Sequence, residues 1–275
     1  MGISQRGQSL TVRNVVLCAD DAGWSAANDH AIARHAAAGE ISAVSVLVDG
    51  PVAHQWRDFD APGRSCSLGL HLNMTWEPGS DSAGLGRLLA AAFLRRLSRS
   101  DLVERIGRQL QRFDELIGRP PEFVDGHQHV HMLSGLRQAL IEVLSKRYGA
   151  TQRPVLRVPY SHSWRGTKAL ALNLLGARAF GRHLTELDWP RNTDFAGAYD
   201  FSDSADYQDH MRQWLAHIRD GGLIMAHPGA DPDLEHGPAR AAESAYFSSP
   251  AWLEDREAAG IRLIPFTSEA LKQAL

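Results

Sequence analysis

The chain has 275 residues, of which 44% are hydrophobic and 22% charged, and its formal net charge is −3. This composition is that of an ordinary globular protein, and the small negative charge gives no indication of a nucleic-acid partner or an anionic membrane surface. Its two cysteines are too few for a disulfide framework, and no apolar run approaches the roughly 20 residues of a membrane span. The polar N-terminus lacks the apolar centre of a signal peptide, so we expect a cytoplasmic protein.

Short apolar runs alternate with helical segments along the whole chain. The clearest helix covers 101–117, where Leu102, Ile106 and Leu110 recur at helical spacing. We expect a weakly helical insertion or lid at 77–100 and a polar loop at 186–205. In chain order, the expected strands are 15–19, 41–48, 65–73, 123–129, 155–158, 222–226 and 261–266. The expected helices are 25–38, 101–117, 134–148, 166–184, 207–219, 249–259 and a closing helix.

This alternation predicts a parallel sheet with helices outside it. About seven strand–helix units in 275 residues fit an irregular TIM-like (β/α) barrel, with α/β architecture, better than an open sheet. No linker, repeat or low-complexity segment interrupts the sequence, so residues 1–275 are predicted to form a single domain. In barrels of this kind, the chemistry lies at the carboxyl ends of the strands.

Two adjacent carboxylates, Asp20 and Asp21, follow the first expected strand. Aspartate is also common in turns and at helix N-caps, so this pair alone would not indicate a site. Adjacent residues of a strand face opposite ways, which would give the two carboxylates different surroundings. One of them can then bind a metal ion while the other acts as a base near the bound water.

Histidines lie at the ends of the third and fourth expected strands. His71 faces away from the leucines of its strand by period two, although a lone histidine there could be structural. His127, His129 and His131 are spaced by two, so they would point to one side if the strand continued. Their span of about 13 Å is too long for one ion. One or two of them are therefore expected to bind metal, and the others to contact substrate or to orient ligands.

Two further residues are candidates for the same site. Arg157 lies inside an apolar strand and needs an anionic partner, which is either a site carboxylate such as Asp20 or a structural partner elsewhere. His227 follows an apolar strand and precedes Pro-Gly, where it is either a general acid or a loop residue held by the turn. The sequence contains no glycine-rich nucleotide motif and no Gly-x-Ser-x-Gly, so a nucleotide cofactor and a serine nucleophile gain no support.

At these residues the sequence resembles the YdjC-like family of carbohydrate deacetylases. The family's opening block, Asn-Ala-Asp-Asp-Phe-Gly, reads Cys-Ala-Asp-Asp-Ala-Gly at 18–23. The family's later blocks follow in order as Gly-Leu-His-Leu-Asn at 69–73, Asp-Gly-His-Gln-His-Val-His at 125–131, Arg-Val-Pro at 157–159, Thr-Asp-Phe-Ala-Gly at 193–197 and His-Pro-Gly at 227–229. The resemblance covers nearly the whole chain, and its departures Cys18, Ala22 and Trp24 remove no ligand, although they could reshape a sugar pocket.

The resemblance implies an irregular (β/α) barrel related to the polysaccharide deacetylases, and hydrolytic removal of the N-acetyl group from an acetylated amino sugar or oligosaccharide. It implies one divalent metal ion, Mg²⁺ or Zn²⁺, and two imidazoles with one carboxylate suit Zn²⁺ on ligand grounds. It also suggests a homodimer. The implied roles are metal ligand for Asp21, His71 and His127, general base for Asp20 and general acid for His227. With this mechanism we also expect Arg157 to take part in catalysis, and Asn73, His129, His131 and Asp194 to contact substrate.

Two other functions remain open. Barrels host many chemistries, so the chain could hydrolyse another acyl bond or a phosphoester bond; a single metal ion favours the acyl group. It could also be a non-catalytic protein that binds metal or carbohydrate. The presence of Asp20 argues against this last alternative, because a binding protein needs the ligands but not the base.

Overall fold

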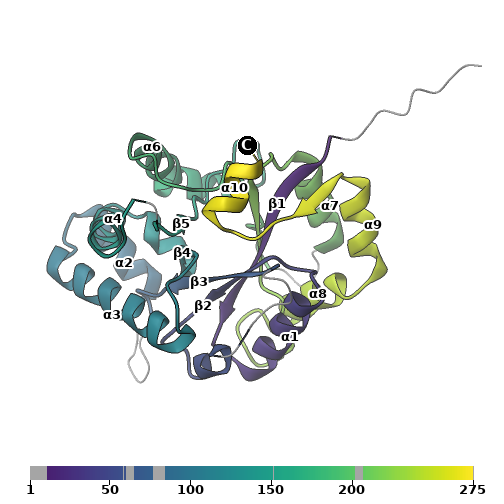
Figure 1. Cartoon of the computed structure of the whole chain (residues 1–275), viewed down its shortest axis with the longest axis horizontal. Coiled ribbons are helices and arrows are strands. Elements are labelled where there is room, and N and C mark those ends of the chain that lie inside the picture. Colours follow the sequence, from purple (N-terminus) through teal and green to yellow (C-terminus); the bar gives the residue numbers. More distant parts are fainter. Residues whose placement is uncertain are drawn as a thin grey trace, which may run out of the picture.

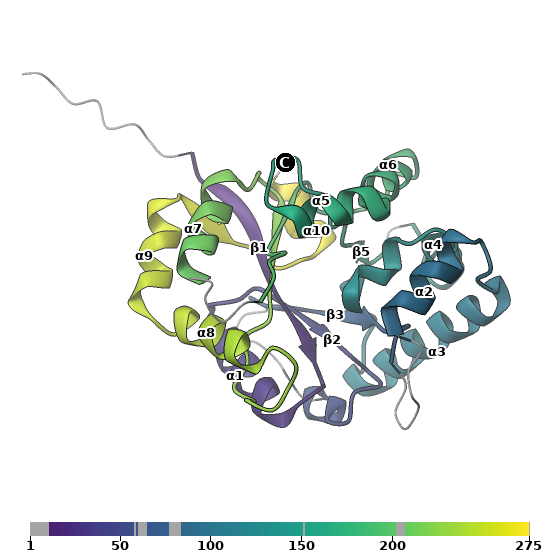
Figure 2. The ribbon, with the colours of Figure 1, turned by 180° about the vertical axis from the view of Figure 1, so that it is seen from behind.

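The computed structural model describes residues 11–57, 59, 65–76, 84–150, 152–201 and 207–274. Within these residues, eight parallel strands form one curled sheet, and helices pack around its outside (Figure 1 and Figure 2). The strands are β1 (Arg13–Ala22), β2 (Ala43–Val46), β3 (Ser67–Leu72), β4 (Phe123–Gly126), β5 (Val155–Leu156), β6 (Phe195–Ala196), β7 (Gly222–Ala226) and β8 (Ile261–Leu263).

The helices occupy the connections between strands, as the alternating pattern predicts. Two elements were missed: β6 is a two-residue strand inside the expected polar loop, and α8 is an alanine-rich helix without clear apolar periodicity. The α-helices are α1 (Ala26–Ala37), α2 (Gly84–Phe93), α3 (Arg99–Ile117), α4 (Leu136–Arg147), α5 (Thr167–Leu172), α6 (Arg178–Glu186), α7 (Tyr207–His217), α8 (Gly237–Phe247), α9 (Pro250–Ala258) and α10 (Ser268–Ala274). Shorter turns of helix cover Ala53–Trp56, His127–Met132 and, as a π-helix, Asn173–Ala177.

The sheet nearly closes on itself. Its strands follow the order β5-β4-β3-β2-β1-β7-β6, and β8 pairs with the first residues of β1. At the two ends of this path, Leu156 of β5 forms a parallel bridge with Arg191, which lies shortly before β6. The eight strands therefore curl into an irregular barrel, which confirms the TIM-like (β/α) fold expected from the sequence.

The inner face of the barrel changes from apolar to polar along the strands. Inward and outward positions alternate because successive side chains of a strand point to opposite faces. The inner apolar cluster includes Cys18, Phe123, Val155 and Met225. Two residues further along the chain from each of these stand Asp20 and Asp125, still within β1 and β4, and Arg157 and His227, directly after β5 and β7. Because side chains two residues apart point to the same face, these polar side chains come together inside the barrel at its carboxyl end.

The fourth strand ends earlier than the sequence suggested. It stops at Gly126, and the following residues form a 3-10 turn in which Gln128 and His129 have positive φ angles of 53° and 58°. The expected strand at 123–129 is therefore too long by three residues, and the condition under which His127, His129 and His131 would point to one side is not met. The turn instead sends their rings in different directions.

The segment 77–100 begins with residues 77–83, which lie outside the described residues. The remainder forms α2 and the start of α3. In α2, Leu85, Leu88 and Leu89 pack against the core, so this part of the expected insertion is an outer helix. None of the helices in the described parts of the chain is both long and apolar enough to cross a membrane.

Candidate active site

A cavity of about 290 Å³ lies at the carboxyl ends of the strands. Its lining comes from segments that are far apart in the sequence: β1, β3, the turn after β4, α5, the residues that follow β6, the end of β7, and the start of α8 with the loop before it. Among the lining residues are six that the sequence singled out: Asp20, Asp21, His71, His127, His129 and His227. The barrel therefore gathers most of the predicted residues into one concave site, which is the usual place for an active site in this architecture.

The end of β1 is distorted where it delivers both aspartates. Asp21 has a φ angle of 64°, and the register between β1 and β2 shifts between Ala19 and Ala22. A regular strand would send adjacent side chains to opposite faces. The irregularity lets both carboxylates face the cavity, yet their surroundings differ as predicted, because Asp20 meets an arginine and Asp21 meets two histidines.

Three potential metal ligands converge at Asp21. Its Oδ1 lies 2.9 Å from His127 Nδ1 and 3.3 Å from His71 Nε2, and the three ligand atoms all lie within 4.8 Å of one another. Its other oxygen, Oδ2, accepts a hydrogen bond from Arg240 Nη2 at 2.5 Å, which leaves Oδ1 for an ion. Two imidazoles and one carboxylate match the protein ligands of a catalytic zinc site, which keeps its fourth position open. Trp24 lies beside the cluster, with its ring centroid 5.1 Å from that of His127.

Asp125 fixes the orientation of His71. Its Oδ1 lies 2.7 Å from His71 Nδ1 and also accepts a hydrogen bond from the Ser45 hydroxyl. A proton held on Nδ1 by a carboxylate leaves Nε2 available to a metal ion, as is common behind metal-binding histidines. Burial by itself would lower the pKa of His71, but the carboxylates of Asp125 and Asp20 raise it to about 10. A proton and a metal ion therefore compete for this imidazole.

Arg157 is fully buried and joins Asp20 to Asp125. Its Nη1 and Nη2 donate to the two oxygens of Asp20, both at 2.6 Å, and Nη2 lies 2.5 Å from Asp125 Oδ2. The bidentate contact fixes the plane of the Asp20 carboxylate. The pairing with Asp20, one of the two alternatives that the sequence left open, is thus present. Cys18, Asp20 and Asp125 are also close enough to share an ion, but Arg157 already contacts all three.

His227 follows β7 and faces the same cavity. Its backbone N–H donates to Glu243 Oε2 at 2.5 Å, and its Nδ1 has no hydrogen-bond partner among the described residues. Burial lowers the pKa of the His227 imidazole to about 4, so the ring is neutral at pH 7. A neutral imidazole can pass a proton on, but it is not the imidazolium that the sequence-based mechanism assumed.

Three expected substrate contacts lie away from this cavity. Asn73 holds the turn after β3 through backbone groups, His131 donates to a backbone oxygen at 2.8 Å, and Asp194 accepts from Arg165 at 2.7 and 2.9 Å. All three predicted contacts are buried and bonded within the protein. His129, by contrast, lines the cavity, and its Nδ1 has no partner in the parts of the chain that the structure describes.

Two buried charged residues of α8 were not anticipated. Arg240 donates to Asp21, and its Nη1 has no partner within the described ranges. Glu243 accepts hydrogen bonds from the Tyr199 hydroxyl at 2.6 Å and from the backbone of His227. The available signal was weak, because only the spacing of three between the two charges indicates a shared helix face. No short motif marks either residue.

Glu243 gives a prediction about stability and pH. Burial raises the pKa of its carboxyl from 4.5 to about 7, so between these values the folded protein holds a proton that the unfolded chain has released. Its contribution to stability is fully present below about pH 4.5 and is lost as the pH rises through about 7. The glutamine of the Glu243→Gln variant does not titrate in this range. As the pH rises through it, the unfolding free energy of the wild type should therefore fall by up to about 3 kcal/mol relative to that of the variant. Urea denaturation of both proteins at about pH 5 and about pH 8 measures this change. The same difference in unfolding free energy between variant and wild type at both pH values would contradict the prediction.

A comparison with family models matches residues 14–258 to the model described as YdjC-like protein. A mouse protein named carbohydrate deacetylase is 34% identical over 170 residues, which are 54% of this chain and 53% of the mouse protein. A Serratia marcescens protein named chitooligosaccharide deacetylase is 27% identical over 148 residues, which are 50% of this chain and 58% of that protein. The chain thus matches about half the length of these curated relatives.

Among solved structures, a protein of Enterococcus faecalis V583 has a similar fold. It is named as a candidate cellobiose-phosphate cleavage protein, and it aligns with a TM-score of 0.69 and 19% sequence identity. The alignment covers 94% of this chain and 100% of that structure. At this level of identity, the similarity supports the barrel architecture and leaves the chemistry to be argued from the site.

Proposed function

Because the chain belongs to the YdjC-like family, we propose that it is a metal-dependent hydrolase that removes the N-acetyl group from an acetylated amino sugar or oligosaccharide. The observation that carries this proposal is the convergence of Asp21, His71 and His127 beside a fourth group, Asp20, which is held apart from them by Arg157. A ligand set with a separate base suits hydrolysis by an activated water. The names of the curated relatives support the acetylated sugar as substrate.

Asp21, His71 and His127 would hold one divalent ion, and their two nitrogen donors favour Zn²⁺ over Mg²⁺, which prefers oxygen ligands. When bound, such an ion supplies a Lewis acid that polarises a carbonyl and lowers the pKa of water. Asp125 keeps the His71 ring in the orientation that this role requires, since the two side chains are 2.7 Å apart.

The protein's own side chains would then move the protons. Asp20 accepts a proton from the attacking water, because Arg157 holds its carboxylate in a fixed plane beside the cavity. The water oxygen bonds to the acetyl carbon, the C–N bond breaks, and acetate and a free amine result. His227, which is neutral before the reaction, takes up the proton that Asp20 received and passes a proton to the leaving nitrogen, so no net proton is lost or gained by the two side chains. Arg240 and His129 line the cavity, and Arg240 Nη1 and His129 Nδ1 are buried without hydrogen-bond partners among the described residues, so a substrate oxygen that reached either nitrogen would satisfy it.

Metal removal tests this function. Chelation is expected to abolish acetate release from a panel of N-acetylated mono- and oligosaccharides, and added Zn²⁺ or Mg²⁺ is expected to restore it, because the water is activated only with the ion in place. His71→Ala should not recover, whereas His54→Ala, a change at an exposed histidine outside the cavity, should behave as the wild type.

The same panel distinguishes the alternatives. No acetate release from a protein shown to contain metal would favour another acyl substrate or a non-catalytic binding role. Release that does not depend on metal would contradict the proposed centre. The homodimer and the cytoplasmic location stay predictions that this assay does not address.

A further inference from the structure

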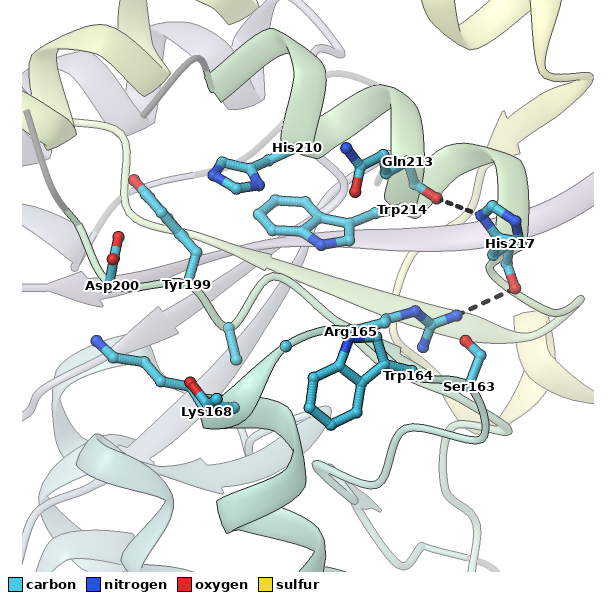
Figure 3. Close-up of a pocket in the computed structure, with 13 residues that line it drawn as sticks. Ser163, Trp164, Arg165, Lys168, Tyr199, Asp200, His210, Gln213, Trp214 and His217 are labelled. Carbon is cyan, nitrogen blue, oxygen red and sulfur yellow. Dashed lines mark hydrogen bonds between the residues drawn. The ribbon is translucent and has the colours of Figure 1, made fainter. Parts of the chain in front are cut away.

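A second and larger cavity, of about 660 Å³, adjoins the catalytic one. Lys168, Ala198 and Tyr199 line both cavities, so the two share a wall. Figure 3 shows the second cavity between the segment that carries Trp164 and Lys168, at the start of α5, and the side of α7 that carries Trp214. A volume in the range of about 300–1,000 Å³ is typical of ligand-binding sites.

The two tryptophans of this cavity have different surroundings. Trp214 is buried, and its ring is stacked with that of His210 at 5.7 Å and lies 5.9 Å from that of Tyr199, so it forms a fixed aromatic wall. Trp164 is 72% exposed on the opposite side. A large aromatic face that is left in water beside a cavity is a feature that a bound ligand would cover. The C–H faces of sugar rings pack well against such a surface.

The charged side chains that line the second cavity nearly balance one another. The hydroxyl of Thr167 and the amide of Gln213 can each donate and accept hydrogen bonds, which suits a ligand rich in hydroxyl groups. The guanidinium of Arg165 is already paired with a buried aspartate at 2.7 Å. Lys168 and Asp200 then contribute one formal charge of each sign. A phosphate-binding site would instead collect positive charge, so the lining favours a neutral ligand.

We propose that this cavity is a second sugar-binding subsite, which makes the substrate a neutral oligosaccharide. The catalytic cavity would hold the N-acetylated ring, and the adjoining cavity would hold the next units, with Trp164 stacked on one of them. This inference rests on the proposed deacetylase function, because it assigns the catalytic cavity to the reacting sugar. With this subsite present, a longer sugar chain should bind more tightly than a shorter one.

Steady-state kinetics with N-acetylglucosamine and its β-1,4-linked tetramer test the subsite. Trp164→Ala is expected to raise KM for the tetramer about five- to tenfold, because a stacking contact of this kind is lost, and to leave the monomer unaffected. Trp164→Phe, which keeps an aromatic face, should recover most of the affinity. The matched control is Phe93→Ala, because Phe93 is 88% exposed at the end of α2 and lines neither cavity.

Calorimetric binding to metal-loaded Asp20→Asn protein separates the subsite from the activity. Tighter binding of the tetramer than of the monomer, weakened by Trp164→Ala, supports the subsite even if the wild type releases no acetate from these sugars. Acetate release with equal affinity for both sugars, or with an equal loss for both in the variant, would overturn the subsite and leave the deacetylase intact. Tighter binding of N-acetylglucosamine 6-phosphate than of the tetramer would overturn the proposal that the second cavity binds an uncharged sugar.

Discussion

Replacing Asp20 with asparagine is expected to lower kcat for acetate release by about 10²–10⁴-fold, while the protein still binds its metal ion. Asparagine has nearly the same shape as aspartate but cannot accept the proton of the attacking water at neutral pH. Asp20 bonds to Arg157 through both oxygens and is not one of the three clustered ligands around Asp21, so metal affinity should be largely retained. Acetate release and the metal content of the purified variant measure the two effects.

The neighbouring carboxylate provides the matched control. Asp21→Asn should lose metal as well as activity, because Asp21 Oδ1 is the atom on which both imidazoles converge. Loss of metal from Asp20→Asn instead would show that Asp20 is a ligand and that the two roles are assigned the wrong way round. Full activity of Asp20→Asn with metal bound would remove Asp20 from the proton transfer.

Arg157→Met is expected to lower the unfolding free energy by about 3–5 kcal/mol, because it leaves buried carboxylates without their positive partner. Asp20 and Asp125 are both within hydrogen-bonding distance of the guanidinium, and all three side chains are almost completely removed from water. The carboxylate of Asp125 would keep its contacts with Ser45 and His71, but Asp20 would lose its bidentate partner. Urea denaturation at pH 7 measures the change.

Arg112→Met is the control for this loss. Arg112 also pairs with an aspartate, Asp49, but its side chain is 52% exposed, and an ion pair in water contributes at most about 1 kcal/mol. A loss for Arg157→Met as small as the loss for Arg112→Met would show that the buried carboxylates do not depend on this arginine. In that case, the assignment of Arg157 as the residue that positions Asp20 would also fail.

The pattern of the sequence was sufficient to predict the barrel and the place of the site. The apolar runs that became β1, β3, β4 and β7 are local features, and the parallel order follows from their alternation with helices. Each of these runs ends in a polar residue, and the carboxyl ends of parallel strands meet at one end of a barrel. For this reason, the aspartate pair at 20–21, His71 and the histidines at 127–131 could be expected to meet at one site, while the choice of Asp21, His71 and His127 as ligands came from the family resemblance.

Side-chain direction at the site depended on the tertiary structure. The bulge at Asp21 and the left-handed residues Gln128 and His129 break the period of two, so Asp21 joins Asp20 at the cavity while His131 turns away from it. Asp21 and His129 contact residues that are remote in the sequence, Arg240 and Phe195, and no local pattern records such contacts. The same holds for Asp194, which was expected to contact substrate and lies in a family block, but whose carboxylate is held by Arg165.

The sequence by itself therefore determined the architecture, the end of the barrel that carries the chemistry, and the types of groups found there, because hydrophobic periodicity and strand direction are local properties. Only the tertiary structure decided which oxygen meets which imidazole, that Arg157 links Asp20 to Asp125, and that Arg240 reaches Asp21 from a helix more than two hundred residues away. It also placed the second cavity beside the first. These are contacts between segments remote in the sequence, and their geometry is set by how the whole barrel packs.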